Sequence, residues 1–403
     1  MKYLIILGDG MADEPIEELG NKTPLEAANK PMIDLLSKQG ELGLVNTIPE
    51  GMSPGSDNAN LSVMGYDPLK YYSGRSPLEA ISMGIEMNQT DISFRCNLVT
   101  LSEEGSYEDK HILDHSADEI TTEEANELIK AIKLIFETEL IHFYTGISYR
   151  HAMIWENGSL NVNLVPPHNI LGKKITEYMP EGEGADLIFH MMKKSYEILN
   201  NHPINDERRK RGLRPANSIW IWGEGKKPLL PSFQEKYGIK GAMISAVDLL
   251  KGIAIAAKMK SIDVEGATGN IHTNYKGKAE ACIKALEEVD FVYLHIEAPD
   301  ECGHRGELEN KIKSIELIDE KIVRPIVEAL ENKSEHFRMM ILPDHPTPIA
   351  LRTHTSNPVP YIIYDSRVHK NSGLSYTEKN AMKTENHCKK GYLLMDHLLE
   401  ITS

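Results

Sequence analysis

The sequence predicts an α/β protein in which a mostly parallel sheet carries helices on both faces and a smaller α+β domain is inserted. Short apolar runs that end in polar residues alternate with segments of helical periodicity, and this alternation is typical of parallel strands joined by helical crossovers. The middle of the chain breaks the alternation, because several strand-like runs surround a single helix there. With 403 residues the chain is too long to fold around one small hydrophobic core, which suggests two or three domains.

The strands and helices of the main domain follow from hydrophobic periodicity. Residues 2–7 (KYLIIL) form a compact apolar run before Gly-Asp-Gly and predict a buried strand, whereas residues 23–40 have helical apolar spacing and end in glycine. Further strands are expected at 291–300, 338–344 and 359–365. Further helices are expected at 244–257, 277–288 and 310–330.

The inserted domain is expected at about residues 91–182, which leaves 1–90 and 183–403 for the main domain. It begins with a strand-like run (ISFRCNLVTL) and acidic turns. One helix and three strands are then expected, at 122–137, 139–145, 149–155 and 159–165. The Pro- and Gly-rich segment 166–186 lacks clear periodicity and predicts the return to the main domain.

The composition argues against several classes of function. Sixty acidic residues against 44 basic ones give a formal charge of −16, which argues against nucleic-acid binding and attachment to anionic membranes, since both need positive surface. The first apolar run is too short for a signal peptide, and no later run approaches the ~20 apolar residues of a membrane span. Four scattered cysteines predict neither a disulfide framework nor a zinc site: Cys96, Cys282, Cys302 and Cys388. A reduced, cytoplasmic protein is therefore expected.

Six Asp and His side chains lie at the ends of predicted strands or in the loops beside them. They are Asp9, Asp300, His304, Asp344, His345 and His354. Each alone could cap a turn or lie on the surface. Because ligands bind outside the carboxyl ends of strands in open α/β sheets, however, these loops should converge on one edge. Carboxylates and imidazoles suit Mn²⁺, Zn²⁺ or Mg²⁺, and six donors exceed the needs of one open site, so the set predicts two metals about 4 Å apart.

Ser56 lies between a Pro-Gly bend and an apolar-periodic segment, which leaves two alternatives. Ser is a preferred N-cap residue, so the hydroxyl could simply cap a helix. A hydroxyl at a helix N-terminus beside divalent cations could instead act as a nucleophile toward phosphorus. The candidate metal site favours the nucleophile. A P-loop, a complete dinucleotide fingerprint and a G-x-S-x-G elbow are absent from the sequence.

A basic run, RRKRGLR at 208–214, also leaves two alternatives. Such runs are common on solvated helix faces, and the chain as a whole is acidic. The other alternative is a set of arginines that grip an anionic substrate, because the planar guanidinium binds carboxylate or phosphate in two places.

Motifs spread over the whole chain resemble those of one family. They include GDGMAD at 8–13, TPLEAANKPMID at 23–34, GSDNANLSVMGYDP at 55–68, YYSGRSPLEA at 71–80, APDECGH at 298–304, PDHPTP at 343–348 and HTSNPVP at 354–360. With them the chain resembles the archaeal-type cofactor-independent phosphoglycerate mutases of the alkaline phosphatase superfamily. The resemblance implies an alkaline-phosphatase-like fold and the interconversion of 2- and 3-phosphoglycerate, with a phosphoserine intermediate at Ser56.

The resemblance also implies a role for each candidate residue. One metal would be held by Asp9, Ser56, Asp344 and His345, and the other by Asp300, His304 and His354. Mn²⁺ is the expected ion, with Zn²⁺, Co²⁺ and Mg²⁺ as alternatives, and no 2,3-bisphosphoglycerate is expected. The inserted domain would bind the substrate, and its candidate residues are His115, Arg150, His151, Arg208 and Arg214.

Two departures from the family concern the substrate. Asn60 stands where the family usually has His, and the segment WIWGEG is less basic than its usual counterpart. A homoserine kinase-like phosphotransferase therefore stays an alternative, as does a metal-dependent phosphomonoesterase. The inserted domain disfavours the esterase because a mutase must shield its phosphoenzyme from water, and the intact ligand set argues against a non-catalytic protein. The expected partner is a small phosphorylated metabolite, and the oligomeric state, a homo-oligomer included, is left open.

Overall fold

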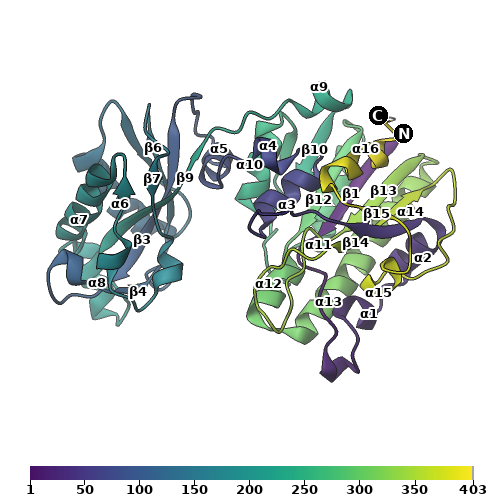
Figure 1. Ribbon diagram of the computed structural model, residues 1–403, viewed down its shortest axis with the longest axis horizontal. Helices are drawn as coiled ribbons and strands as arrows, with labels where there is room; N and C mark the ends of the chain where they lie inside the picture. Colours follow the sequence, from purple (N-terminus) through teal and green to yellow (C-terminus); the bar gives the residue numbers. More distant parts are fainter. Residues whose placement is uncertain (402–403) are drawn as a thin grey trace. The chain divides into compact units, whose positions relative to one another are not determined.

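The chain folds into two compact units (Figure 1), and the computed structural model describes residues 1–401. The larger unit comprises Met1–Tyr72 and the chain from Leu229 onward, and the smaller unit is Ser73–Pro228. The smaller unit is thus inserted into the larger one, but it begins earlier and ends later than residues 91 and 182. Hydrophobic packing sets these limits, because segments on both sides of 91–182 join the core of the smaller unit.

The larger unit is built on an eight-stranded sheet that is parallel except at one strand. In spatial order its strands are β11 (Lys260–Ile262), β10 (Gly241–Ile244), β12 (Phe291–Ile296), β1 (Lys2–Gly8), β13 (Phe337–Leu342), β14 (Val359–Asp365), β2 (Glu41–Val45) and β15 (His387–Cys388). Only β14 runs against its neighbours. The carboxyl ends of β10, β12, β1 and β13 therefore lie side by side at one edge.

Helices cover both faces of this sheet, which confirms the predicted fold class. On one face, alternate strand residues such as Leu4, Ile6 and Leu294 form a single buried cluster with four helices. These helices are α2 (Pro31–Gln39), α11 (Tyr275–Ala285), α13 (Leu308–Ile318) and α14 (Arg324–Asn332). The intervening residues Ile5 and Leu7 are equally buried on the other face. That face is covered by α10 (Asp248–Ala256) and α16 (Leu394–Leu399), which contact β10 and β13.

Several short helices complete the larger unit. They are α1 (Pro24–Ala27), α3 (Ser56–Val63), α4 (Pro68–Tyr71), α9 (Phe233–Tyr237), α12 (Ala298–Arg305) and α15 (Glu378–Ala381). The helix predicted at 23–40 is divided into α1 and α2, because Pro31 restrains the preceding Lys30 to a non-helical conformation. The helix predicted at 310–330 is interrupted by the π-helical turn Asp319–Val323. None of the helices within residues 1–401 is long and apolar enough to cross a membrane.

The smaller unit is an antiparallel sheet packed on helices. Its central strand β3 (Ile92–Leu101) pairs with β4 (Ile112–Asp114), β6 (Arg150–Trp155) and β9 (Ser218–Lys226), and β6 pairs with β5 (Ile141–Tyr144). A separate ribbon joins β7 (Val162–Asn163) to β8 (Glu181–Gly182). Its helices are α5 (Ser76–Ser82), α6 (Thr122–Phe136), α7 (Ala185–Leu199) and α8 (Pro203–Lys210).

The ends of the smaller unit explain the misplaced boundaries. In α5, Ala80 packs with Ala152 and Ile154 of β6, and residues of α7 and β9 share the main core of this unit. The segment 166–186, predicted as the return crossing, stays within the smaller unit and contributes Ile170 and Ile175 to that core. A helix followed by a strand at 185–226 has the same local pattern as continued α/β winding, so sequence periodicity could not assign it to either unit.

Candidate active site

The predicted metal ligands meet at the carboxyl edge of the large sheet. Asp9 directly follows β1, Asp300 lies in α12 after β12, and Asp344 follows β13. His354 precedes the reversed strand β14, whose amino end lies at this same edge because it runs antiparallel to β13. The carboxyl ends of the parallel strands thus bring together residues that lie hundreds of positions apart in the chain, at the edge of the sheet where ligands bind in such folds.

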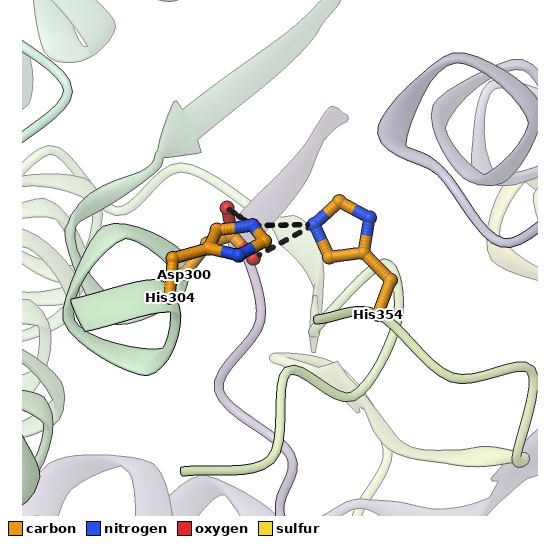
Figure 2. Close-up of side chains that lie close together, drawn as sticks. All are labelled: Asp300, His304 and His354. Atoms are coloured by element: carbon orange, nitrogen blue, oxygen red, sulfur yellow. Dashed lines mark hydrogen bonds and ion pairs between the residues drawn. The ribbon is translucent and has the colours of Figure 1, made fainter. Parts of the chain in front are cut away.

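Asp300, His304 and His354 form one compact group of donors (Figure 2). Four residues apart on α12, Asp300 and His304 share a helix face. The Nε2 atoms of His304 and His354 each lie 3.3 Å from an Asp300 oxygen and 2.8 Å from each other. On its other side, the His304 Nδ1 is 3.0 Å from the carbonyl oxygen of Arg352, which orients the ring and leaves Nε2 for a ligand role.

A second group contains Asp9, Asp300 and His345. The Nε2 of His345 lies 3.7 Å from an Asp9 oxygen, 3.3 Å from an Asp344 oxygen and 3.1 Å from the Ser56 hydroxyl. Asp300 is therefore common to both groups, whereas the resemblance implied that it serves only one metal. All of these carboxyl groups are buried.

The charges of this centre fit bound cations. The Asp9 Oδ1 is buried and has no hydrogen-bond partner in the described part of the chain. Burial and the nearby Asp344 and Asp300 raise the pKa of Asp9 well above its ordinary value. Burial also acts to raise the pKa of Asp300, but hydrogen bonds with His304 and His354 hold it well below its usual range. Several buried carboxylates beside imidazoles repel one another unless cations offset them, and this donor set suits divalent metals.

Close backbone contact holds the centre together at Gly10. This residue has a φ of +62°, and a Cβ there would lie 2.7 Å from the Asp300 Cα. Its N–H donates to the Asp344 Oδ1, 3.2 Å away. Glycine is required because any side chain would be strained and would push the loops after β1 and β12 apart.

Lys311 supports the candidate metal centre, and sequence analysis did not single it out. Its fully buried ammonium donates to the carboxylate of Asp13 (2.7 Å) and to the carbonyl oxygens of Thr347 (2.8 Å) and Ala12 (3.3 Å). It thereby ties the loop that carries Asp9 to the loop that carries Asp344. A lysine in a helix is ordinarily solvated, and its place among apolar neighbours (Ile312, Ile315) is the only sequence signal for burial.

Ser56 is not a helix cap. It is the first residue of α3, the N-cap is Gly55, and no side chain makes the capping hydrogen bond. The half-buried hydroxyl instead lies beside the His345 imidazole. The capping alternative is therefore wrong, because Ser56 follows the N-cap, makes no capping hydrogen bond, and its hydroxyl lies in the donor cluster. Its role as nucleophile stays a prediction.

The predicted substrate residues of the smaller unit have different environments. Arg208 is buried, and its guanidinium donates to Glu124 and to the carbonyl oxygens of Arg214 (2.9 Å) and Ala117 (2.5 Å). Because its guanidinium is buried and bonds to groups inside the unit, Arg208 does not have the environment predicted for a substrate residue. His151 is also buried, its Nδ1 accepts the Gly146 N–H, and burial lowers its pKa to about 3.

The rest of the basic run is also ion-paired. Arg209 lies 2.8 Å from Glu103, and Arg211 pairs with Glu124. Arg214 is half exposed and pairs with Asp114 at 3.1 Å. The basic run is therefore neither an unpaired solvated helix face nor a set of unpaired arginines that could bind an anion. Acidic side chains distant in sequence form ion pairs with it.

Three other arginines gather with two histidines elsewhere in the smaller unit. We name this group the arginine cluster, and its members are Arg75, Arg95, Arg150, His115 and His168. The Arg95 guanidinium stacks 4.2 Å from the centre of the Trp222 ring, and the Arg150 guanidinium lies 4.6 Å from that of Tyr149. The His115 and His168 rings are 6.1 Å apart, and these same two aromatic rings flank them.

Two arginines of the arginine cluster pair with the Glu79 carboxylate. Arg75 and Arg95 lie 2.8 and 2.9 Å from Glu79. Burial acts to raise the pKa of Glu79, but Arg95 and Arg75 hold it below its ordinary value. Burial and the charge of Arg95 lower the pKa of His168. One signal was available in the sequence, because Arg95 is the only charged residue of its strand (ISFRCNLVTL).

Comparison with known proteins identifies the family. Over 402 residues the chain is 49% identical to a protein of Geobacter sulfurreducens described as a probable 2,3-bisphosphoglycerate-independent phosphoglycerate mutase, covering 99% of this chain and 100% of the relative. The chain belongs to the 2,3-bisphosphoglycerate-independent phosphoglycerate mutase family. The family model of that description matches residues 37–205.

Solved structures of similar proteins support the same membership in this mutase family. A protein from Pyrococcus horikoshii is similar with a TM-score of 0.82 and 31% identity, over 100% of this chain and 98% of that one. The cofactor-independent phosphoglycerate mutase of Thermoplasma acidophilum is similar with a TM-score of 0.68 and 27% identity, over the full length of both chains. The family resemblance drawn from the motifs is thus confirmed along the whole sequence.

Proposed function

We propose that the protein interconverts 2- and 3-phosphoglycerate through a phosphoserine formed on Ser56. One observation carries the proposal: the Ser56 hydroxyl lies 3.1 Å from the Nε2 of His345, inside the cluster of carboxylates and imidazoles at the sheet edge. A hydroxyl in such surroundings can act as a nucleophile, whereas a capping serine would be directed at backbone N–H groups.

Two divalent cations would be held by this cluster. Asp300, His304 and His354 would hold one, and Asp9, Asp344, His345 and Ser56 the other, with Asp300 near both. The unpartnered Asp9 Oδ1 and the mixed carboxylate and imidazole donors support this assignment, with Mn²⁺ first and Zn²⁺, Co²⁺ or Mg²⁺ as alternatives. When bound, such cations would lower the pKa of a serine hydroxyl and offset the charge of a phosphoryl group.

The chain's own residues would then carry out two transfers. The Ser56 oxygen forms a bond to phosphorus as the bond between phosphorus and one substrate hydroxyl oxygen breaks, and that oxygen takes up a proton. The glycerate then attacks with its other hydroxyl and regenerates the serine. No phosphate is gained or lost, so 2,3-bisphosphoglycerate is not needed. The N-terminus of α3, where Ser56 lies, favours a phosphoryl anion.

The arginine cluster would bind the substrate in the smaller unit. The Glu79 carboxylate pairs with Arg75 and Arg95 and holds their guanidinium groups in place. Guanidinium groups held in this way suit a substrate carboxylate, since each can donate two parallel hydrogen bonds. From the sequence prediction we therefore retain His115 and Arg150 and leave out the buried His151 and Arg208 and the ion-paired Arg214. We add Arg75, Arg95 and His168.

The environment of Asn60 gives no evidence for a different substrate. Its side chain is fully buried and bonds to Asp344, Tyr293 and the Ser56 carbonyl oxygen. The departure from the family's usual His at this position therefore concerns the support of a carboxylate rather than recognition of the phosphoryl acceptor. The partner expected remains a small phosphorylated metabolite, and the expected compartment is the cytoplasm.

The decisive assay compares two reactions of the purified protein. In the first, 3-phosphoglycerate and Mn²⁺ are supplied without 2,3-bisphosphoglycerate, and ³¹P NMR follows the appearance of 2-phosphoglycerate. In the second, homoserine, ATP and Mn²⁺ are supplied. We expect turnover in the first reaction only, and loss of turnover on chelation. Turnover only in the second would replace the mutase with a phosphotransferase, and release of inorganic phosphate from 3-phosphoglycerate would indicate a phosphomonoesterase.

A further inference from the structure

Two alternate residues of strand β12 extend toward the candidate metal centre. Tyr293 and His295 are separated by one residue, so their side chains lie on the same face of the sheet. Both are fully buried, and each is hydrogen-bonded in a chain that ends at a different carboxylate. Their neighbours on the strand, Val292 and Leu294, belong to the apolar cluster of the other face.

The first chain runs from Tyr293 through Asn60 to Asp344. The Tyr293 hydroxyl donates to the Asn60 Oδ1 at 2.6 Å. The Asn60 Nδ2 donates to the Asp344 Oδ2 at 3.0 Å and to the Ser56 carbonyl oxygen at 2.8 Å. The reverse amide orientation would turn the Asn60 oxygen toward a carboxylate, so the phenol helps to keep the donor there. The Asp344 Oδ1 accepts N–H groups from Gly10 and His345, which leaves Oδ2 on the ligand side.

The second chain runs from Ser245 through His295 to Asp9. The His295 Nε2 lies 2.9 Å from the Asp9 Oδ2, and its Nδ1 lies 3.1 Å from the Ser245 hydroxyl oxygen. A carboxylate oxygen only accepts, so Nε2 donates, and Nδ1 accepts from the serine hydroxyl. The Ser245 oxygen in turn accepts the Val247 N–H at 3.0 Å. With Oδ2 occupied, the remaining oxygen of Asp9 is the one near His345.

We propose that Tyr293 and His295 are positioning residues that orient the Asp344 and Asp9 carboxylates toward the metal ions. Neither touches the substrate, and Tyr293 acts through Asn60. The inference rests on the proposed function, because it assigns these carboxylates as ligands. It goes beyond the ligand set itself by explaining why one buried strand carries a phenol and an imidazole among apolar residues. Groups that hydrogen-bond to metal ligands set the ligands' orientation and basicity.

A double-mutant cycle tests the Tyr293 chain. Mn²⁺ binding to metal-free protein is measured by titration calorimetry without substrate for wild type, Tyr293→Phe, Asn60→Ala and the double variant. We expect Tyr293→Phe to weaken binding about fivefold, as for loss of one hydrogen bond. We also expect it to add no further weakening in the Asn60→Ala background, since the phenol acts through the amide. Tyr376→Phe is the matched control, because Tyr376 is equally buried and donates at 2.9 Å to the Pro360 carbonyl oxygen away from the ligands.

His295 is tested by removal and by partial replacement. His295→Leu removes the donor to Asp9 and should weaken Mn²⁺ binding about tenfold or more. His295→Gln can place an amide N–H near the position of Nε2 and should recover part of that loss.

The results separate this inference from the proposed function. If wild type binds Mn²⁺ and both Tyr293→Phe and His295→Leu bind it equally well, the positioning role is wrong while the metal centre stands. Tyr293→Phe decides the matter by itself if His295→Leu does not fold. A wild-type protein that isomerises phosphoglycerate but binds no divalent ion would overturn the metal centre and this inference together.

Discussion

Arg208→Met provides a direct test of whether a predicted substrate residue is instead a structural one. Arg208 is 1% exposed, and three groups accept from its guanidinium: the Glu124 carboxylate and the carbonyl oxygens of Ala117 and Arg214. Methionine fills the aliphatic part of the site but donates no hydrogen bond. A buried carbonyl group, a partly buried one and the Glu124 carboxylate are then left without their partner. Such a loss costs about 3–5 kcal/mol.

This loss should be visible as a lower melting temperature with unchanged substrate binding. For a unit of this size each kcal/mol corresponds to about 2–4 °C, so calorimetry should show the transition of the smaller unit lowered by roughly 10 °C. The KM for 3-phosphoglycerate, measured well below that transition, should stay within about twofold of wild type, since Arg208 is buried away from a substrate.

The matched control is Arg214→Met. Arg214 is 53% exposed and pairs with Asp114 near the surface, so its loss should cost less than about 1 kcal/mol. A tenfold rise in KM for Arg208→Met, with the melting temperature of wild type, would refute the structural assignment and return Arg208 to the substrate site.

Four further predictions follow from the two units. Ser56→Ala should abolish turnover while retaining part of the Mn²⁺ affinity, and mass spectrometry of the wild type with substrate should detect phosphate on Ser56. A near-normal rate for the variant would exclude Ser56 as the nucleophile. Activity lost to EDTA should return with Mn²⁺, and an active protein free of divalent ions by elemental analysis would contradict the metal centre. Arg95→Met should raise KM at least about tenfold, whereas Arg209→Met, which removes the ion pair with Glu103, should not; equal KM values for the two variants would remove Arg95 from the substrate site. Burial raises the pKa of Glu378 from 4.5 to about 7, so its carboxyl favours the folded state at low pH and this contribution is lost as the pH rises from about 4.5 to about 7. In urea unfolding at several pH values, Glu378→Gln should lose this part of the pH dependence of the unfolding free energy. Parallel curves of unfolding free energy against pH for wild type and variant would show that the carboxyl does not titrate in this range.

The sequence by itself was sufficient for the fold class and for the list of candidate ligands. Buried parallel strands are short apolar runs, and β1, β13 and β14 were recognised from them within one or two residues. Because ligands in such folds follow strand ends, Asp9 and Asp344 could be named without knowing which strands are neighbours. The reversed direction of β14, which brings His354 to the same edge, is a property of the sheet and is seen only in the structure.

Only the tertiary structure decided which charged side chains are available for chemistry. Arg95 lies between apolar residues in the sequence and Arg208 lies in a basic run, yet Arg208 is the one buried against Glu124, 84 positions away, and Arg95 belongs to the arginine cluster. Likewise, Asn60 supports Asp344 across 284 positions, and Lys311 bonds to Asp13 across 298. Periodicity reports only which face of an element is apolar, whereas the role of a polar group depends on partners that the fold brings to it from elsewhere in the chain.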